Sequence, residues 1–133
     1  MCGIVGATAN REIIDVIING LRTLEYRGYD SAGIAVAQAD RIRVRKRTGK
    51  ITELEQHLQG DPLHGQCAIG HTRWATHGEP SVRNAHPHIC KDHVAVVHNG
   101  IIENHEILRA QQKTAGHRFT SETDTEVIVH AIH

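Results

Sequence analysis

The feature that most constrains this chain is the cysteine at its second position. Cys2 is followed by Gly3 and by the apolar run Ile4-Val5-Gly6-Ala7, which predicts a short strand. Removal of Met1 would leave one residue that carries both a thiol and a free α-amine. A free cysteine has a pKa of about 8.5 and an α-amine one of about 7.7–8.0, so a single residue can supply a nucleophile and its base. The alternative is that Cys2 is a small hydrophobic residue at the start of a strand.

Composition sets broad limits on fold and partners. The 133 residues suit a single domain spanning residues 1–133. Lys plus Arg (15) balance Asp plus Glu (15), so we expect no nucleic acid and no anionic membrane as a partner. No apolar run approaches the ~18 residues that span a bilayer. Three widely spaced cysteines do not form a disulfide pattern, and a reducing cytoplasm is the predicted location.

Hydrophobic periodicity predicts strands alternating with helices. The expected strands are residues 2–7, 32–37, 41–45, 66–72 and 93–98, with the second and third forming a hairpin. The expected helices are residues 10–28, 51–60, 104–116 and a last one that begins near 123. Residues 73–87 lack an apolar period, so we expect a long loop of the kind that forms lids or binding sites.

Several local features are also predicted. Asn10 is expected to cap the first helix, and Thr123-Asp124-Thr125-Glu126 to form a capping box at the last one. Cys67, inside an apolar strand, is expected to be a buried structural thiol. The last helix reaches His133 without a stop signal, which favours a truncated chain over a terminal helix that frays.

Polar clusters follow the predicted strands, where sites are commonly built. Asn99 offers a side-chain amide and Gly100 a backbone N–H, which together make a plausible oxyanion hole. A tight hairpin turn is the alternative for this dipeptide, but the chain continues into a helix. Arg73 can bind a carboxylate and Asp124 an ammonium group, a combination that suits a free amino acid. Taken singly, each could be an ordinary surface or helix-start charge.

Six motifs occur in order along the chain. They are Met1-Cys2-Gly3-Ile4-Val5-Gly6, residues 25–33 (EYRGYDSAG), residues 70–78 (GHTRWATHG), Asn84-Ala85-His86-Pro87-His88, residues 98–104 (HNGIIEN) and residues 121–126 (SETDTE). With these motifs the chain resembles class II glutamine amidotransferases. Within that class it is most similar to the N-terminal glutaminase domain of the glutamine–fructose-6-phosphate aminotransferase (isomerising) family.

The resemblance implies an α+β fold of the N-terminal-nucleophile type, with antiparallel sheets sandwiched by helices and incomplete in this chain. It also implies the site. Cys2 would be the nucleophile and its α-amine the base, with Asn99 and Gly100 as the oxyanion hole. By the same resemblance, Arg73, Thr76 and His77 would bind the glutamine carboxylate, and Asp124 would bind its ammonium group. Trp74 would gate the passage of ammonia, and Arg27 would support the site. No cofactor and no metal are expected.

The implied function is hydrolysis of the L-glutamine side-chain amide to glutamate and ammonia, the ammonia-donating half of glucosamine-6-phosphate synthesis. In the family this domain continues past residue 133, and two sugar-isomerase domains follow. This sequence contains neither the rest of that domain nor the sugar-isomerase domains, so the chain by itself is not expected to make glucosamine 6-phosphate.

Two other functions stay open at this stage. A truncated fragment could bind glutamine without turnover, or pair with a second copy through unpaired strand edges as a homo-oligomer. A zinc protein is the other alternative, because imidazole and thiolate are zinc ligands. The candidate ligands are His71, His77, His86, His88 and His98 with Cys90, although none of their spacings is that of a closed zinc site.

Overall fold

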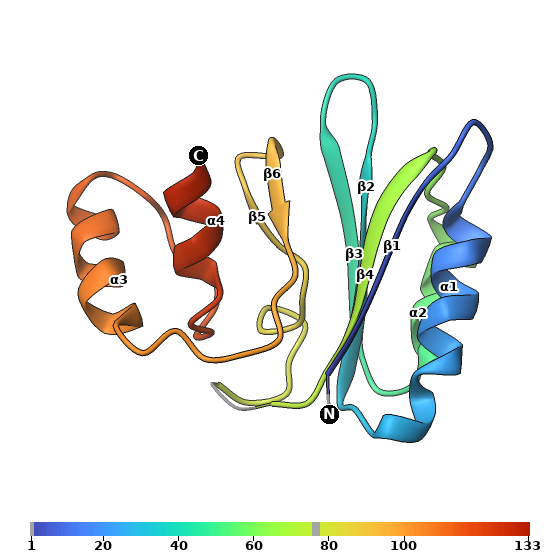
Figure 1. Cartoon of the computed structure of the whole chain (residues 1–133), viewed down its shortest axis with the longest axis horizontal. Helices are drawn as coiled ribbons and strands as arrows, with labels where there is room; N and C mark the ends of the chain where they lie inside the picture. The colour runs from blue at the N-terminus through green and yellow to red at the C-terminus, as the bar shows by residue number, and fades with distance from the viewer. Residues whose placement is uncertain (1, 76–77) are drawn as a thin grey trace.

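The structure is a computed structural model that describes residues 2–75 and 78–133. Its elements are β1 (Gly3–Thr8), α1 (Ile14–Thr23), the 3-10 helix η1 (Glu25–Arg27), β2 (Ser31–Ala37), β3 (Ile42–Thr48), α2 (Ile51–Gly60), β4 (Cys67–Arg73), β5 (His88–Cys90), β6 (Val94–Val96), α3 (His105–Thr114) and α4 (Glu126–Ile132). In Figure 1 they form successive layers: α3 and α4, the β5–β6 sheet, the larger sheet, and α1 with α2. The predicted α+β fold, with antiparallel sheets between helices, is confirmed. No described helix has the length and apolar character needed to cross a membrane.

The strand pairing in the larger sheet determines where the N-terminal residues lie. Its strand order is β1-β4-β2-β3, and each neighbouring pair is antiparallel. On one side of β4, Thr72 lies opposite Gly3 of β1; on the other, Arg73 lies opposite Ser31 of β2. The end of β4 therefore lies between the beginnings of β1 and β2. This arrangement brings Cys2 next to the residues that follow β4.

Helices α1 and α2 cover one face of the larger sheet (Figure 1). The fully buried side chains of this layer are Ile13, Ile17, Leu21, Ile34, Val36, Ile51 and Leu54. Each large aliphatic side chain buried in this way stabilises the fold by roughly 1.5–3 kcal/mol. Glycine at position 70 allows the close approach of α1, because a Cβ there would lie 2.7 Å from Cγ2 of Ile17.

The opposite face of the sheet carries the segment that leads into β5. A Cβ built at Gly33 of β2 would lie only 1.9 Å from the backbone oxygen of His86, so this backbone packs directly on the strand. The His86–Pro87 peptide bond in this segment is cis. The β5–β6 pair follows, and α4 and α3 lie on its outer side (Figure 1).

Most predicted elements are present with shifted ends, and the 32–37/41–45 hairpin is confirmed as β2–β3. The short strand β5 was not predicted. Asn10 does not cap α1, because the helix begins at Ile14 and Ile13 occupies the N-cap position. Cys67 is exposed at the first position of β4, so its prediction as a buried thiol is wrong.

The predicted capping box at α4 is also wrong. Helix α4 begins at Glu126 with Thr125 at the N-cap and no side-chain cap. The carboxylate of Glu126 instead accepts hydrogen bonds from the backbone nitrogens of Thr120 (3.0 Å) and Ser121 (2.8 Å). It therefore fixes the segment before the helix and does not cap the helix itself.

Gly33→Ala tests the direct packing of the His86 backbone on β2. The added methyl group has no room against a backbone atom, so we expect the free energy of unfolding to fall by about 1–3 kcal/mol, the usual cost of overpacking. Urea denaturation followed by circular dichroism measures this change. Gly60→Ala is the matched control, because a Cβ there meets no atom within 4 Å. Equal denaturation midpoints for the two variants would contradict the packing described here.

Candidate active site

The site is built around the sulfur of Cys2 at the junction of β1 and β4. The backbone nitrogen of Trp74 donates a hydrogen bond to Cys2 Sγ at 3.2 Å, and Sγ lies 3.7 Å from the carbonyl oxygen of Trp74. The backbone nitrogen of Gly3 donates to Thr72 Oγ1 at 3.1 Å. These contacts hold the thiol against the end of β4, at the mouth of a cavity.

The cavity has a volume of about 520 Å³ and collects most of the predicted site residues. Those that line it are Cys2, Arg27, Arg73, Trp74, Asn99, Gly100 and Asp124. The other lining residues are His86, His98, Ile101, Thr123 and Thr125. Thr76 and His77, predicted to bind substrate, lie outside the described residues. A volume of this size suits a small ligand.

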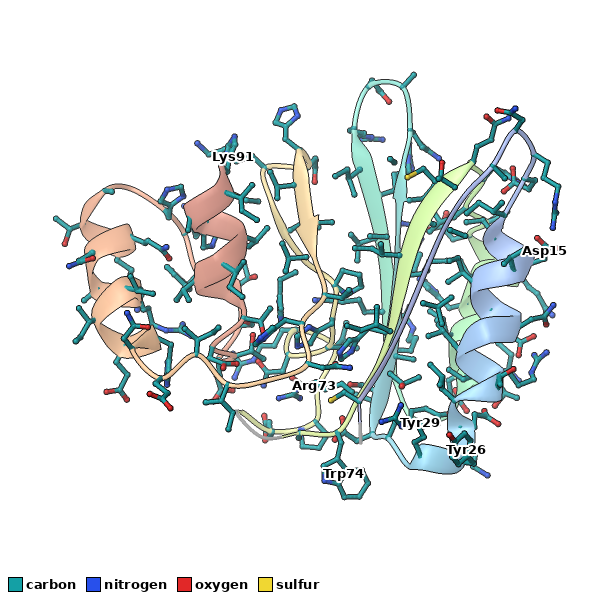
Figure 2. The ribbon with its side chains drawn as sticks, in the orientation of Figure 1. Asp15, Tyr26, Tyr29, Arg73, Trp74 and Lys91 are labelled. Atoms are coloured by element: carbon teal, nitrogen blue, oxygen red, sulfur yellow. The ribbon has the colours of Figure 1, made fainter. Side chains whose placement is uncertain are left out.

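Arg73 is the buried cation of the cavity and is only 3% exposed. Its guanidinium group donates to the carbonyl oxygens of Glu79 (3.3 Å) and Gly78 (3.4 Å). Burial lowers the pKa of Arg73, and the nearby charges of Asp30 and Asp124 oppose that shift. Figure 2 shows Trp74 projecting out of the molecule at the end of β4, whereas Arg73 lies among interior side chains.

Asp124 supplies a negative charge and also positions the oxyanion-hole candidates. It is 3% exposed, and its Oδ2 accepts a hydrogen bond from the backbone nitrogen of Ile102 at 2.6 Å. Ile102 closely follows Asn99 and Gly100 in the chain. The carboxylate is therefore tied to the same loop that carries Asn99 and Gly100.

Asn99 is held in one orientation by a buried histidine. His71 Nε2 lies 2.8 Å from Asn99 Oδ1. Burial lowers the pKa of His71 to about 4, so the ring is neutral at pH 7, and a carbonyl oxygen can only accept. Nε2 therefore carries the proton and donates it to Asn99. This contact directs the Asn99 amide nitrogen away from His71, where it can donate to a ligand.

The remaining histidines of this region brace the cavity. The rings of His71 and His86 stack with centroids 4.1 Å apart, and the backbone nitrogen of His98 donates to His86 Nδ1 at 3.4 Å. His88 Nε2 contacts Thr123 Oγ1 at 2.8 Å. Burial lowers the pKa of both His86 and His88. The described histidines of the zinc hypothesis (71, 86, 88 and 98) do not form a metal-ligand group; His77 is outside the described residues.

Sequence reasoning missed the supporting role of Asp30. Its Oδ2 accepts from the backbone nitrogen of Ala75 at 2.6 Å, and its own nitrogen donates to the carbonyl oxygen of Arg73 at 2.7 Å. Asp30 therefore fixes the first residues of the loop after β4. An aspartate directly before a strand, inside a motif that also contains Arg27, was the available signal. Its partner 45 residues away could not be read from spacing.

The sequence is similar to those of known proteins. The sequence model of a family described as "Glutamine amidotransferase domain" matches residues 40–133. A glutamine–fructose-6-phosphate aminotransferase (isomerizing) of Pseudomonas syringae is 61% identical over 100% of this chain, and one of Escherichia coli K12 is 59% identical over 99%. The chain spans 22% of the length of each of these relatives.

Two solved structures share the fold. One is a glutamine phosphoribosylpyrophosphate amidotransferase from B. subtilis complexed with ADP and GMP, with a TM-score of 0.80 and 30% identity. The other is described as the allosteric regulatory enzyme of purine biosynthesis, with a TM-score of 0.82 and 31% identity. Each comparison covers 99% of this chain and 29% of the other.

The neutral, buried state of His71 predicts how stability depends on pH. The folded-state pKa of about 4 is below the unfolded value of about 6.5, so only the unfolded chain binds this proton between the two. The free energy of unfolding should therefore fall as pH decreases from about 6.5 to 4, by up to about 1.4 kcal/mol per pH unit for each such histidine. His71→Gln keeps an N–H donor for Asn99 and cannot titrate, so its slope should be shallower by about that amount.

Urea denaturation at a series of pH values measures the slope. His64→Gln is the control, because His64 is exposed and lies outside the cavity, so it should change the slope less than His71→Gln does. A His71→Gln slope equal to that of the unmodified chain would show that His71 is not held neutral.

Proposed function

Because the chain belongs to the glutamine amidotransferase domain family, we propose that it hydrolyses the side-chain amide of L-glutamine to glutamate and ammonia. The single observation that carries this proposal is one cavity that contains a thiol, candidate oxyanion donors, a buried cation and a buried carboxylate. These are the groups that attack on the amide of a free amino acid requires. Residues 1–133 then form the N-terminal part of a glutaminase domain.

Cys2 is the proposed nucleophile. Removal of Met1 frees the α-amine, which accepts the thiol proton as Sγ attacks the amide carbon. The amine then gives this proton to the leaving nitrogen, and ammonia departs as the thioester forms. Water attacks the thioester, glutamate is released, and Cys2 regains its proton. The reaction requires no cofactor and no metal.

Asn99 and Gly100 are the proposed oxyanion hole. The tetrahedral intermediate carries negative charge on the former amide oxygen, and donors fixed in advance stabilise it by several kcal/mol. The contact between His71 and Asn99 Oδ1 supports this role, because it orients the amide nitrogen before substrate arrives. Gly100 contributes its backbone N–H.

Arg73 and Asp124 are the proposed clamp for the head of the amino acid. A guanidinium group binds the α-carboxylate, and a carboxylate binds the α-ammonium. Thr76 and His77 are proposed to join Arg73 on the carboxylate. Trp74 is proposed to gate ammonia and Arg27 to support the site; the exposure of the Trp74 side chain (54%) suits a residue at the mouth of the cavity.

The use of the ammonia is proposed from the relatives. They are named glutamine–fructose-6-phosphate aminotransferases, and this chain corresponds to 22% of their length. We infer that the ammonia serves glucosamine-6-phosphate synthesis and that sugar-isomerase domains are the natural partners. The reaction is assigned to the reducing cytoplasm, which keeps the thiol reduced. Association with a second copy of the chain remains part of this proposal.

Cys2→Ser tests the nucleophile. We expect ammonia release from L-glutamine to fall by at least about 10³-fold, as is typical when a catalytic nucleophile is removed. An electrophilic glutamine analogue should add to Cys2, and intact mass should show that Met1 is absent. Cys67→Ser is the control and should keep full activity, because Cys67 is exposed and lies outside the cavity. Equal labelling of the three cysteines would overturn the assignment. Glutamine binding without ammonia release would support a binding fragment instead.

A pair of cavity variants separates chemistry from binding. Asn99→Ala should lower kcat by about 10²–10³-fold with little change in KM, because the donor acts in the transition state. Asp124→Asn keeps an oxygen that can accept from Ile102 but loses the charge, so KM should rise by about tenfold or more. Steady-state kinetics at saturating and limiting glutamine measure both constants. The reverse pattern, with kcat lost in Asp124→Asn and KM raised in Asn99→Ala, would refute the assigned roles.

A further inference from the structure

A cysteine and three histidines from separate segments gather beyond the catalytic cavity, towards the end of α4. Cys90 ends β5, His117 follows α3, His130 is in α4, and His133 is the last residue. His130 Nδ1 lies 3.2 Å and His133 Nδ1 3.1 Å from the sulfur of Cys90. A ligand atom from each of Cys90, His117 and His130 lies within 4.8 Å of the other two. Figure 2 agrees with this placement, since Lys91, directly after β5, lies beside the end of α4.

His130 is oriented in the manner of a metal ligand. Its Nε2 lies 2.9 Å from Glu126 Oε2, and because a carboxylate can only accept, Nε2 carries a proton. In the neutral ring, Nδ1 then directs its lone pair towards the Cys90 sulfur. Carboxylate–histidine pairs of this kind commonly fix the tautomer and orientation of metal-binding histidines. Both side chains are buried, with exposed fractions of 6% for His130 and 1% for Glu126.

The spacing suits a tetrahedral ion. Zn–S and Zn–N bonds of about 2.3 and 2.0–2.1 Å at tetrahedral angles place sulfur and nitrogen about 3.6 Å apart. The two observed sulfur–nitrogen distances, 3.2 and 3.1 Å, are shorter by a few tenths of an ångström. Small side-chain movements would therefore admit an ion. Cys90, His117 and His130 also line a second cavity of about 560 Å³, which gives an ion a route of entry.

We propose that Cys90, His117 and His130 bind a divalent ion of the zinc type, with solvent in the fourth position. Thiolate and imidazole favour such an ion over magnesium or calcium, which prefer oxygen ligands. On binding, the Cys90 thiol gives up its proton to solvent and the sulfur bonds to the metal. The ion joins the end of β5, the segment after α3 and the C-terminal part of α4, and it takes no part in glutamine hydrolysis.

The test uses the 133-residue chain without an affinity tag and with Cys2→Ser and Cys67→Ser, so that Cys90 is the single thiol. Co²⁺ added to the metal-free protein should bind with one equivalent and give tetrahedral d–d bands with a thiolate-to-cobalt charge-transfer band. Zn²⁺ should displace the Co²⁺ and raise Tm. This parent already lacks the proposed nucleophile, so the result is independent of glutaminase activity.

Variants of the cluster decide the assignment. Cys90→Ser should abolish the charge-transfer band, and His117→Ala should weaken Zn²⁺ binding by at least about tenfold, measured by competition with a chromophoric chelator. His64→Ala, an exposed histidine outside the cluster, is the matched control and should bind Zn²⁺ like the parent. If circular dichroism shows that Cys90→Ser does not fold, His117→Ala decides alone. An octahedral cobalt spectrum in the parent, or equal Zn²⁺ affinity in His117→Ala and His64→Ala, would overturn the proposal.

Discussion

The antiparallel pairing of β1 with β4 is the constraint on which the site depends. With Gly3 opposite Thr72, residue 2 lies beside the loop after β4, where the backbone nitrogen of Trp74 reaches the sulfur. A slip of one residue would turn each side chain of β1 to the other face of the sheet. Close packing helps to fix the register, because a Cβ at Gly3 would lie 2.5 Å from Cδ1 of Leu24. The fixed register thus gives Cys2, near the N-terminus, one defined position beside the end of β4.

Neutral polar contacts then connect neighbouring layers around the cavity. His71 of β4 reaches Asn99 after β6, and His88 of β5 reaches Thr123 before α4. Buried polar groups are costly unless they are paired, so these contacts specify how the layers fit together. Because burial keeps His71 neutral, the bracing adds no charge that would compete with Arg73 for a carboxylate. Structural support and the proposed ligand recognition thus fall to different side chains.

Sequence reasoning found the cavity residues that belong to local motifs and missed side chains whose role is set by the partners they meet in the fold. Arg73 ends β4 and Asn99 follows β6, a position that favours a site in most α/β arrangements, and both line the cavity. Asp30 and Glu126 could not be assigned in the same way. Glu126 has the spacing of a capping box, but its carboxylate accepts instead from the backbone of Thr120 and Ser121 before the helix and contacts the ring of His130 within it. Cys67 has apolar neighbours on one side, yet it begins a strand and is exposed.

Helix α4 links the cavity beside Cys2 with the proposed metal site. Its first residue follows Asp124 and Thr125, which line the cavity, and His130 lies one turn further along the same helix. Glu126 sits between them and accepts from both the backbone before the helix and the His130 ring. A helix of this length has little stability in isolation, so its position depends on tertiary contacts. An ion on His130 would therefore restrain the C-terminal part of α4, the helix whose first turn fixes the backbone before it through Glu126.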